Sequence, residues 1–326
     1  MKRRDFLGSV AAGVFLLPYR VGLAQQLSGE RRVGIIGNGP LWDYFRERLR
    51  ELGDVEGQNI TLESRSANGD SDRLLAAARE LAHRPVEVIA VAGSPAAKAA
   101  QEATDTVPVV AMVIGDPVAI GLVKDWRRPG GNITGSTTLS PNLAAKRLQL
   151  LKDILPYLSR IAYLFDPENP SSRAYLEHLR SAASLISATI IAVEVRARSE
   201  FDEAFEKIMN NRANAMIMAG DIVQERDIED IIAFQLQQRL PGMFTRREDV
   251  DAGGLISYGV SVPALYRSGA DYVHRILHGA RPADLPFAQP AKLELIINVA
   301  ASKTIGITIP PSILAAADEV ISDEEE

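Results

Sequence analysis

From Arg31 onward, short apolar runs alternate along the chain with stretches of helical spacing. Runs rich in Val, Ile and Ala, which are typical of buried strands, lie at 33–36, 60–64, 86–91 and 107–114. Helical patterns, in which apolar residues recur every three or four positions, separate them at 41–52, 72–83 and 95–103. Continuous apolar strands that alternate with helices indicate a parallel sheet covered on both faces.

The same order then starts again in the second half of the chain. The first strands of the two series begin at Val33 and Ile161, 128 positions apart. Further strands are expected at 190–195, 215–219 and 242–245, with helices at 172–186, 201–210 and 225–239. The sequence therefore predicts an α/β protein with two doubly wound, parallel-sheet lobes.

A C-terminal segment follows the second series and is too short to form a third domain. It carries a helical pattern at 262–278, a strand pattern at 293–298 and a last helical pattern at 311–320. We expect it to pack back across both lobes, so that the chain crosses between them more than once and forms a hinge. The expected domains are 31–136 plus about 258–290, and 137–257 plus about 291–321, followed by an acidic tail at 322–326.

The composition excludes several classes of chemistry. The 326 residues include no cysteine, so a thiol nucleophile, a cysteine zinc site and an iron–sulfur cluster are all ruled out. A net charge of −6 would repel a phosphate backbone, so no nucleic-acid partner is expected. Among the four histidines, His274 and His278 alone have metal-ligand spacing, but they lack the Glu of a metalloprotease helix. We interpret that pair as part of a solvated face and predict no metal and no cofactor.

Residues 1–24 read as an export signal. Basic residues at 2–4 precede an apolar run at 10–17, and the small residues Gly22 and Ala24 offer a cleavage site. The apolar run is shorter than the ~20 residues that span a bilayer. The string RRDFL resembles a twin-arginine signal, and an ordinary secretory signal is the alternative. Either route predicts a periplasmic protein.

Candidate binding residues lie just after the predicted strands, because ligands of open parallel sheets bind outside the carboxyl ends of the strands. Serines at helix N-termini suit a carboxylate, aspartates suit an ammonium group, and aromatic rings suit an apolar ligand surface. Ser94 is expected to cap a helix whose first residue is Pro95. Helix capping is the alternative interpretation of the Ser, Asp and Asn positions, and a simple turn is a further alternative for Asp116 with Pro117. Core packing is the alternative for Trp42 and Tyr258. The candidates are Asn38, Trp42, Ser94, Asp116, Asn169, Ser171, Asp221 and Tyr258.

One loop hints at a dinucleotide site. The string GIIGNG at 34–39 lies between a strand and a helix, and Glu63 ends the second strand where a ribose-binding acid would lie. The order of its glycines is not that of the G-x-G-x-x-G fingerprint, and Pro40 and Trp42 crowd the place of a pyrophosphate. This signal keeps a periplasmic Rossmann-type oxidoreductase as an alternative.

Several blocks together resemble one family. They are VIAVAGSPAA at 88–97, GDPV at 115–118, RPGGNITG at 128–135, KRL at 146–148 through Pro156, GGLISYG at 253–259 and TIPPS at 308–312. The chain from about Arg32 to Ile321 looks like an ABC transporter substrate-binding protein of the tryptophan/tyrosine type, with a type I periplasmic binding fold. The resemblance implies a receptor without catalytic activity that closes on a small solute. By position, it implies that the cleft holds Ser94, Asp116, Asn169, Ser171, Asp221 and Tyr258.

The leading hypothesis is therefore a solute-binding protein of an ABC uptake transporter. Its ligand is expected to be an amino acid, aromatic ones included, or a related carboxylate. Its expected partner is a permease in the inner membrane, and the receptor itself is expected to be a monomer. The alternatives are the oxidoreductase and a sensory module that uses the same cleft to feed a signalling partner.

Overall fold

The computed structural model describes residues 31–322, except 68–69, 139, 219 and 222–225. The expected export signal at 1–24 and residues 323–326 of the acidic tail lie outside the described residues. Within those residues, no helix combines the length and apolar character that crossing a membrane requires.

The first lobe is built on a five-stranded sheet in which every pairing is parallel. Its strand order is β2-β1-β3-β4-β5. The chain begins at the inner strand β1, next places β2 at one edge, and then continues through β3, β4 and β5 to the other edge, as a doubly wound sheet does. The strands are β1 (Arg31–Ile36), β2 (Ile60–Arg65), β3 (Val88–Ala92), β4 (Val109–Ile114) and β5 (Ile133–Thr137).

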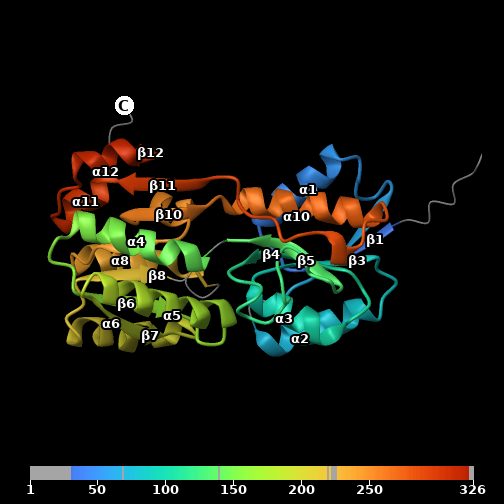
Figure 1. Ribbon diagram of the computed structural model, residues 1–326, viewed down its shortest axis with the longest axis horizontal. Helices are drawn as coiled ribbons and strands as arrows, with labels where there is room; N and C mark the ends of the chain where they lie inside the picture. The colour runs from blue at the N-terminus through green and yellow to red at the C-terminus, as the bar shows by residue number, and fades with distance from the viewer. Residues whose placement is uncertain (1–30, 68–69, 139, 219, 222–225, 323–326) are drawn as a thin grey trace, which may run out of the picture.

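Helices cover both faces of this sheet (Figure 1). One face carries α2 (Ser71–Ala82) and α3 (Ser94–Ala103), whose small apolar side chains form one buried cluster with the strands. The other face carries α1 (Leu41–Glu51) and α10 (Val262–Leu277), which form a second cluster around Trp42. The C-terminal segment therefore supplies half of the covering of one face of the first lobe.

The second lobe has a seven-stranded sheet of order β12-β11-β10-β9-β8-β6-β7. All its pairings are parallel except that between β10 and β11, which is antiparallel. The strands are β6 (Arg160–Phe165), β7 (Thr189–Glu194), β8 (Ala215–Met218), β9 (Gly242–Phe244), β10 (Ile256–Val260), β11 (Leu293–Asn298) and β12 (Glu319–Ile321).

Two apolar clusters again lie on the two faces of this sheet. One joins it to α4, α5, α11 and α12, and the other joins it to α6 and α8. The helices are α4 (Ser140–Ile154), α5 (Pro170–Leu185), α6 (Phe201–Asn210), α8 (Ile228–Gln237), α9 (Arg247–Asp251), α11 (Val299–Ile305) and α12 (Pro311–Ala316), with short 3-10 turns at Arg198–Glu200 and Pro282–Asp284.

The predicted fold class is confirmed, and the differences lie at its edges. The sequence missed β5, α4 and β12, and it extended the last helix to residue 320 although α12 ends at Ala316. Tyr258, at the expected boundary between the lobes, lies within β10, where it pairs with Leu295 of β11. The chain leaves the second sheet only after Val260.

Three segments connect the lobes: after β5, between β10 and α10, and before β11 (Figure 1). The first and third run side by side. The backbone N–H of Thr137 donates to the carbonyl of Ala288 over 2.9 Å, and the N–H of Ala288 donates to the carbonyl of Gly135 over 2.7 Å. This arrangement confirms the expected multi-crossing hinge.

Candidate functional site

The N-termini of α3 and α5, one from each lobe, meet between the lobes. The Ser94 hydroxyl oxygen lies 2.6 Å from that of Ser171, and a second contact joins the Ser71 hydroxyl to a Glu168 carboxylate oxygen at 3.4 Å. In Figure 1 the start of α5 lies against α3 on the side of the molecule opposite the crossing segments. The two lobes are therefore in contact at these helix starts as well as at the crossing segments.

The start of α3 differs from the sequence prediction. Gly93 is the N-cap residue, with φ +84, and Ser94 is already the first helical residue with no capping bond from its side chain. The expectation that Ser94 caps the helix is wrong, because the glycine makes the turn at no steric cost. The Ser94 hydroxyl, whose residue is only 2% exposed, faces the other lobe instead.

The start of α5 is fixed by a buried carboxylate. Asn169 caps the helix by accepting from the Ser171 N–H over 3.0 Å, and its amide donates to Asp221 over 2.5 Å. Asp221 also accepts from the Ser172 hydroxyl over 2.7 Å and from the Asp166 N–H over 2.7 Å. The sequence singled out Asn169, Ser171 and Asp221, and the structure brings the three together. Ser172 and Asp166 belong to the same network.

Burial controls the charge of this network. It raises the pKa of Asp221 from the ordinary 3.8 to about 6, although the donated hydrogen bonds oppose that rise. Burial likewise raises the pKa of Asp166, and it raises that of Tyr163 well above its usual value, with the nearby Asp221 charge adding to the effect. Asp221 therefore changes its charge close to neutral pH.

Two other predicted residues lie in loops at strand ends. Asp116 is half-buried, and one carboxylate oxygen accepts from the N–H groups of Val118 at 2.9 Å and Ala119 at 3.0 Å. Asp116 therefore forms the turn that is the alternative interpretation of this position. Asn38 is exposed in the loop between β1 and α1. Their contacts with a ligand stay predictions.

The two predicted aromatic residues have different surroundings. Trp42 is 1% exposed and packs edge-on against Phe45 and Tyr266, each with ring centroids 5.3 Å away. Its ring is part of the first-lobe core. Tyr258 is half-buried in β10, next to the segment that crosses to the first lobe.

Arg147 on α4 is a residue of this region that the sequence analysis did not select. It is 2% exposed, its Nε donates to the Tyr258 carbonyl over 2.7 Å, and its Nη1 donates to the Tyr175 hydroxyl over 2.8 Å. The guanidinium thereby ties the end of β10 to α5. An arginine on the apolar face of a helical pattern, beside Leu148 and Leu151, was the signal that could have found it.

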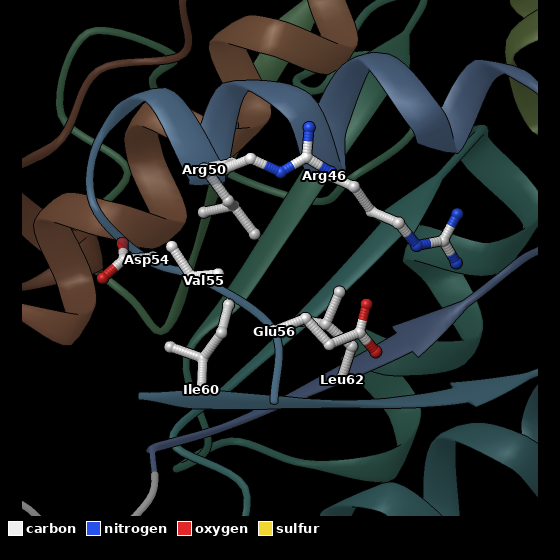
Figure 2. A pocket seen from close by; sticks show the side chains of 8 residues that line it. Arg46, Arg50, Asp54, Val55, Glu56, Ile60 and Leu62 are labelled. Carbon is white, nitrogen blue, oxygen red and sulfur yellow. The ribbon is translucent and has the colours of Figure 1, made fainter. Parts of the chain in front are cut away.

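A separate cavity of about 210 Å³ lies on the first lobe (Figure 2). It opens between α1 and the start of β2 and contains none of the predicted ligand-binding residues. Its walls combine two arginines with apolar side chains: Arg46, Leu49, Arg50, Asp54, Val55, Glu56, Ile60 and Leu62. It is not part of the contact between the lobes.

Two doubly wound lobes, joined by three crossings and meeting at two helix N-termini, define a bilobed receptor of the type I periplasmic binding fold. A family model described as ABC transporter substrate binding protein matches residues 41–321, and the chain belongs to this family. It is a substrate-binding protein of an ABC transporter. The match favours the receptor over the oxidoreductase alternative.

Relatives agree with this assignment. A tyrosine-binding protein of Clostridioides difficile (strain R20291) is 23% identical over 255 residues, which cover 78% of this chain and 73% of the relative. A conserved domain protein from Vibrio cholerae O1 biovar El Tor shares the fold with a TM-score of 0.83 and 26% identity, covering 89% and 99% of the two chains. An ABC domain from Streptococcus pneumoniae in complex with L-Trp has a TM-score of 0.82 and 23% identity, covering 90% and 100%.

Proposed function

We propose that this protein is a periplasmic receptor that closes its lobes on an amino acid, aromatic ones included, or a related small carboxylate. It then presents the ligand to an ABC permease in the inner membrane. The contact between Ser94 and Ser171 carries this proposal, since it joins two helix N-termini from opposite lobes at 2.6 Å. The tyrosine-binding relative and the L-Trp complex support an amino acid as ligand.

A carboxylate fits between these helix ends better than a neutral group does. Helix N-termini carry partial positive charge and unpaired N–H groups, and a hydroxyl on each side adds a donor. A ligand that inserts there replaces the direct contact between Ser94 and Ser171 and bridges the lobes. We assign its ammonium group to Asp116 or Asp221, one from each lobe, with Asp221 also holding the loop that presents Ser171.

Closure requires that the lobes move as units. The proposed units are 31–136 with about 258–290, and 137–257 with about 291–321. They would rotate about the three crossing segments, two of which are hydrogen-bonded to each other. The receptor is proposed to work as a monomer, because the ligand site lies between the lobes of one chain.

Calorimetry on the chain from residue 25 onward, with L-Tyr, L-Trp and L-Leu as ligands, tests the proposal. Ser171→Ala is expected to weaken binding about tenfold, the effect of losing one hydrogen bond to a charged group. Ser181→Ala removes an exposed hydroxyl further along the same helix and is expected to leave the affinity unchanged. Equal affinities of the two variants would contradict the assignment of the carboxylate to the helix ends.

Ligand analogues separate the two ends of the site. Tyramine and tryptamine lack the carboxylate and are expected to bind at least tenfold more weakly than the amino acids. The deaminated acids test the partner of the ammonium group. They are expected to bind the wild type more weakly than the amino acids do. This difference in affinity should disappear in the variant, Asp116→Asn or Asp221→Asn, that lacks the carboxylate contacting the ammonium group. A protein that binds none of the amino acids or acids would refute the ligand class.

A further inference from the structure

Three titratable side chains gather at the end of the first lobe that is farthest from the second lobe. His274 lies in the last turn of α10, His278 is its C-cap residue, and Asp54 follows the turn that ends α1. The His274 Nδ1 lies 2.7 Å from an Asp54 carboxylate oxygen. In Figure 2 the Asp54 carboxylate points toward α10 and away from the cavity. In Figure 1 α10 runs from the crossing region to the outer end of the lobe.

Hydrogen bonds fix the ring orientation of both histidines. The His278 Nδ1 lies 2.7 Å from the carbonyl oxygen of His274, and a carbonyl can only accept, so this nitrogen carries the hydrogen. The His274 Nδ1 is held in the same way by the Asp54 carboxylate, which is 3% exposed. In the neutral rings, both Nε2 atoms therefore keep a lone pair available for a metal.

The two rings also lie close enough to share one ion. Their centroids are 4.2 Å apart, and one ligand atom from each of Asp54, His274 and His278 lies within 4.8 Å of the other two. Nitrogen ligands about 2.1 Å from a tetrahedral ion lie roughly 3.4 Å apart. Rings with centroids 4.2 Å apart allow two nitrogens to reach that spacing.

We propose that His274 and His278 bind a divalent transition-metal ion of the Zn²⁺ class, with Asp54 holding His274 in the ligating tautomer. Two imidazoles select zinc, copper or nickel over the oxygen-loving Mg²⁺ and Ca²⁺. A carboxylate behind a ligating histidine raises the basicity of that ligand and fixes its orientation. Water would complete the coordination on the exposed side of His278.

Arg31 on the neighbouring strand β1 would compete with the ion. Its Nη1 lies 3.2 Å from the His278 Nε2 and 3.4 Å from its Nδ1, and these contacts are at the surface. A bound ion must displace the guanidinium from the Nε2 lone pair and must tolerate its positive charge. The site therefore predicts that removing this arginine strengthens metal binding, an effect that a merely structural histidine pair would not show.

Titration of the full mature chain, purified without a histidine tag and stripped with a chelator, tests the proposal. Zn²⁺ binding is followed against a chromogenic competitor, with Ni²⁺ and Cu²⁺ as further probes and Mg²⁺ as the negative one. We expect one Zn²⁺ per chain. His274→Gln and His278→Gln should each weaken binding at least tenfold, Asp54→Asn by about 10- to 100-fold, and Arg31→Ala should tighten it.

His83→Gln is the matched control. His83 is exposed and its Nδ1 also lies 2.7 Å from the carbonyl four residues earlier, but within the part of the chain that the structure describes it belongs to no such cluster. Its replacement should leave Zn²⁺ affinity unchanged. In long-range ¹H–¹⁵N spectra, Zn²⁺ should shift the Nε2 resonances of His274 and His278 alone. Absence of saturable binding below 1 mM would overturn the proposal, as would binding that survives His278→Gln in protein with unchanged circular dichroism.

Discussion

Replacement of the buried Asp221 by Asn isolates the free-energy cost of burying the charged carboxylate. Burial raises the pKa of Asp221 from 3.8 to about 6, so between these values the folded protein keeps a proton that the unfolded chain releases. The stabilising contribution of the protonated group is complete below about pH 3.8 and is lost as the pH rises to about 6. A shift of roughly two pKa units corresponds to about 3 kcal/mol.

Asp221→Asn cannot ionise, so it should lose this dependence on pH. The variant also loses one acceptor, because an Asn side chain cannot accept from both Asn169 and the Asp166 N–H while keeping its own donor satisfied. That loss costs about 1 kcal/mol at every pH. The variant should therefore be less stable than the wild type near pH 4 and more stable, by about 2 kcal/mol, near pH 7.

Urea unfolding at pH 4, 5, 6 and 7, followed by far-ultraviolet circular dichroism, measures the difference between variant and wild type. Surface ion pairs titrate alike in both proteins, so their contributions cancel in the difference between the two free energies of unfolding. Ser181→Ala replaces an exposed residue that does not ionise and is expected to keep the wild-type slope. ¹³C NMR of the Asp221 carboxyl gives its pKa directly. Titration near pH 4, or an unchanged slope in Asp221→Asn, would refute the reasoning.

Substitutions at Gly135, Arg147 and Trp42, with matched controls, test the packing and the place of Trp42. Gly135→Ala would place its Cβ 1.7 Å from the Ala111 carbonyl oxygen and should lower the free energy of unfolding by about 3 kcal/mol or more. Gly131→Ala is the control, because its Cβ would meet nothing within 4 Å, and it should be nearly neutral in thermal unfolding. Arg147→Met removes two buried hydrogen bonds from a guanidinium and should cost about 3 kcal/mol in urea unfolding; a neutral result would show that the pair of bonds does not stabilise the fold. Trp42→Ala should lower the free energy of unfolding by roughly 3–5 kcal/mol, because the ring is buried. Trp42→Phe should leave the ligand affinity measured by calorimetry within about twofold. A larger loss of affinity would place the ring at the ligand.

The fold was predictable where burial is achieved by apolar side chains alone. Runs such as β3 and β4 consist of Val, Ile, Ala and Met, and their pattern identifies a covered parallel strand. The strand β5 reads ITGST and was missed, although all five residues are buried. Its Thr134 hydroxyl donates to the carbonyl of Leu285, 151 positions away, over 2.6 Å. A polar strand of this kind is stabilised by a partner that no local pattern reveals.

The candidate site was likewise predictable only in part. The rule that ligands bind beyond strand ends selected Ser94 and Ser171, and the structure brings their hydroxyls together. The same rule could not tell that Trp42, which follows the first strand closely, lies in α1 and packs into the core. It also could not pair Asp54 with His274, which lie 220 positions apart.

The position of α10 has a consequence for the order in which the protein folds. This helix closes one face of the first sheet, and it packs so tightly that a Cβ on Gly269 would lie 2.0 Å from the Met112 sulfur. Yet it follows β5, the last strand of that sheet, by more than 120 residues. At a synthesis rate of about 5–20 residues per second, α10 would be made roughly 6–25 s after β5. The first lobe to be made is thus completed only after most of the second, and the part of its apolar face that α10 covers stays exposed during that interval.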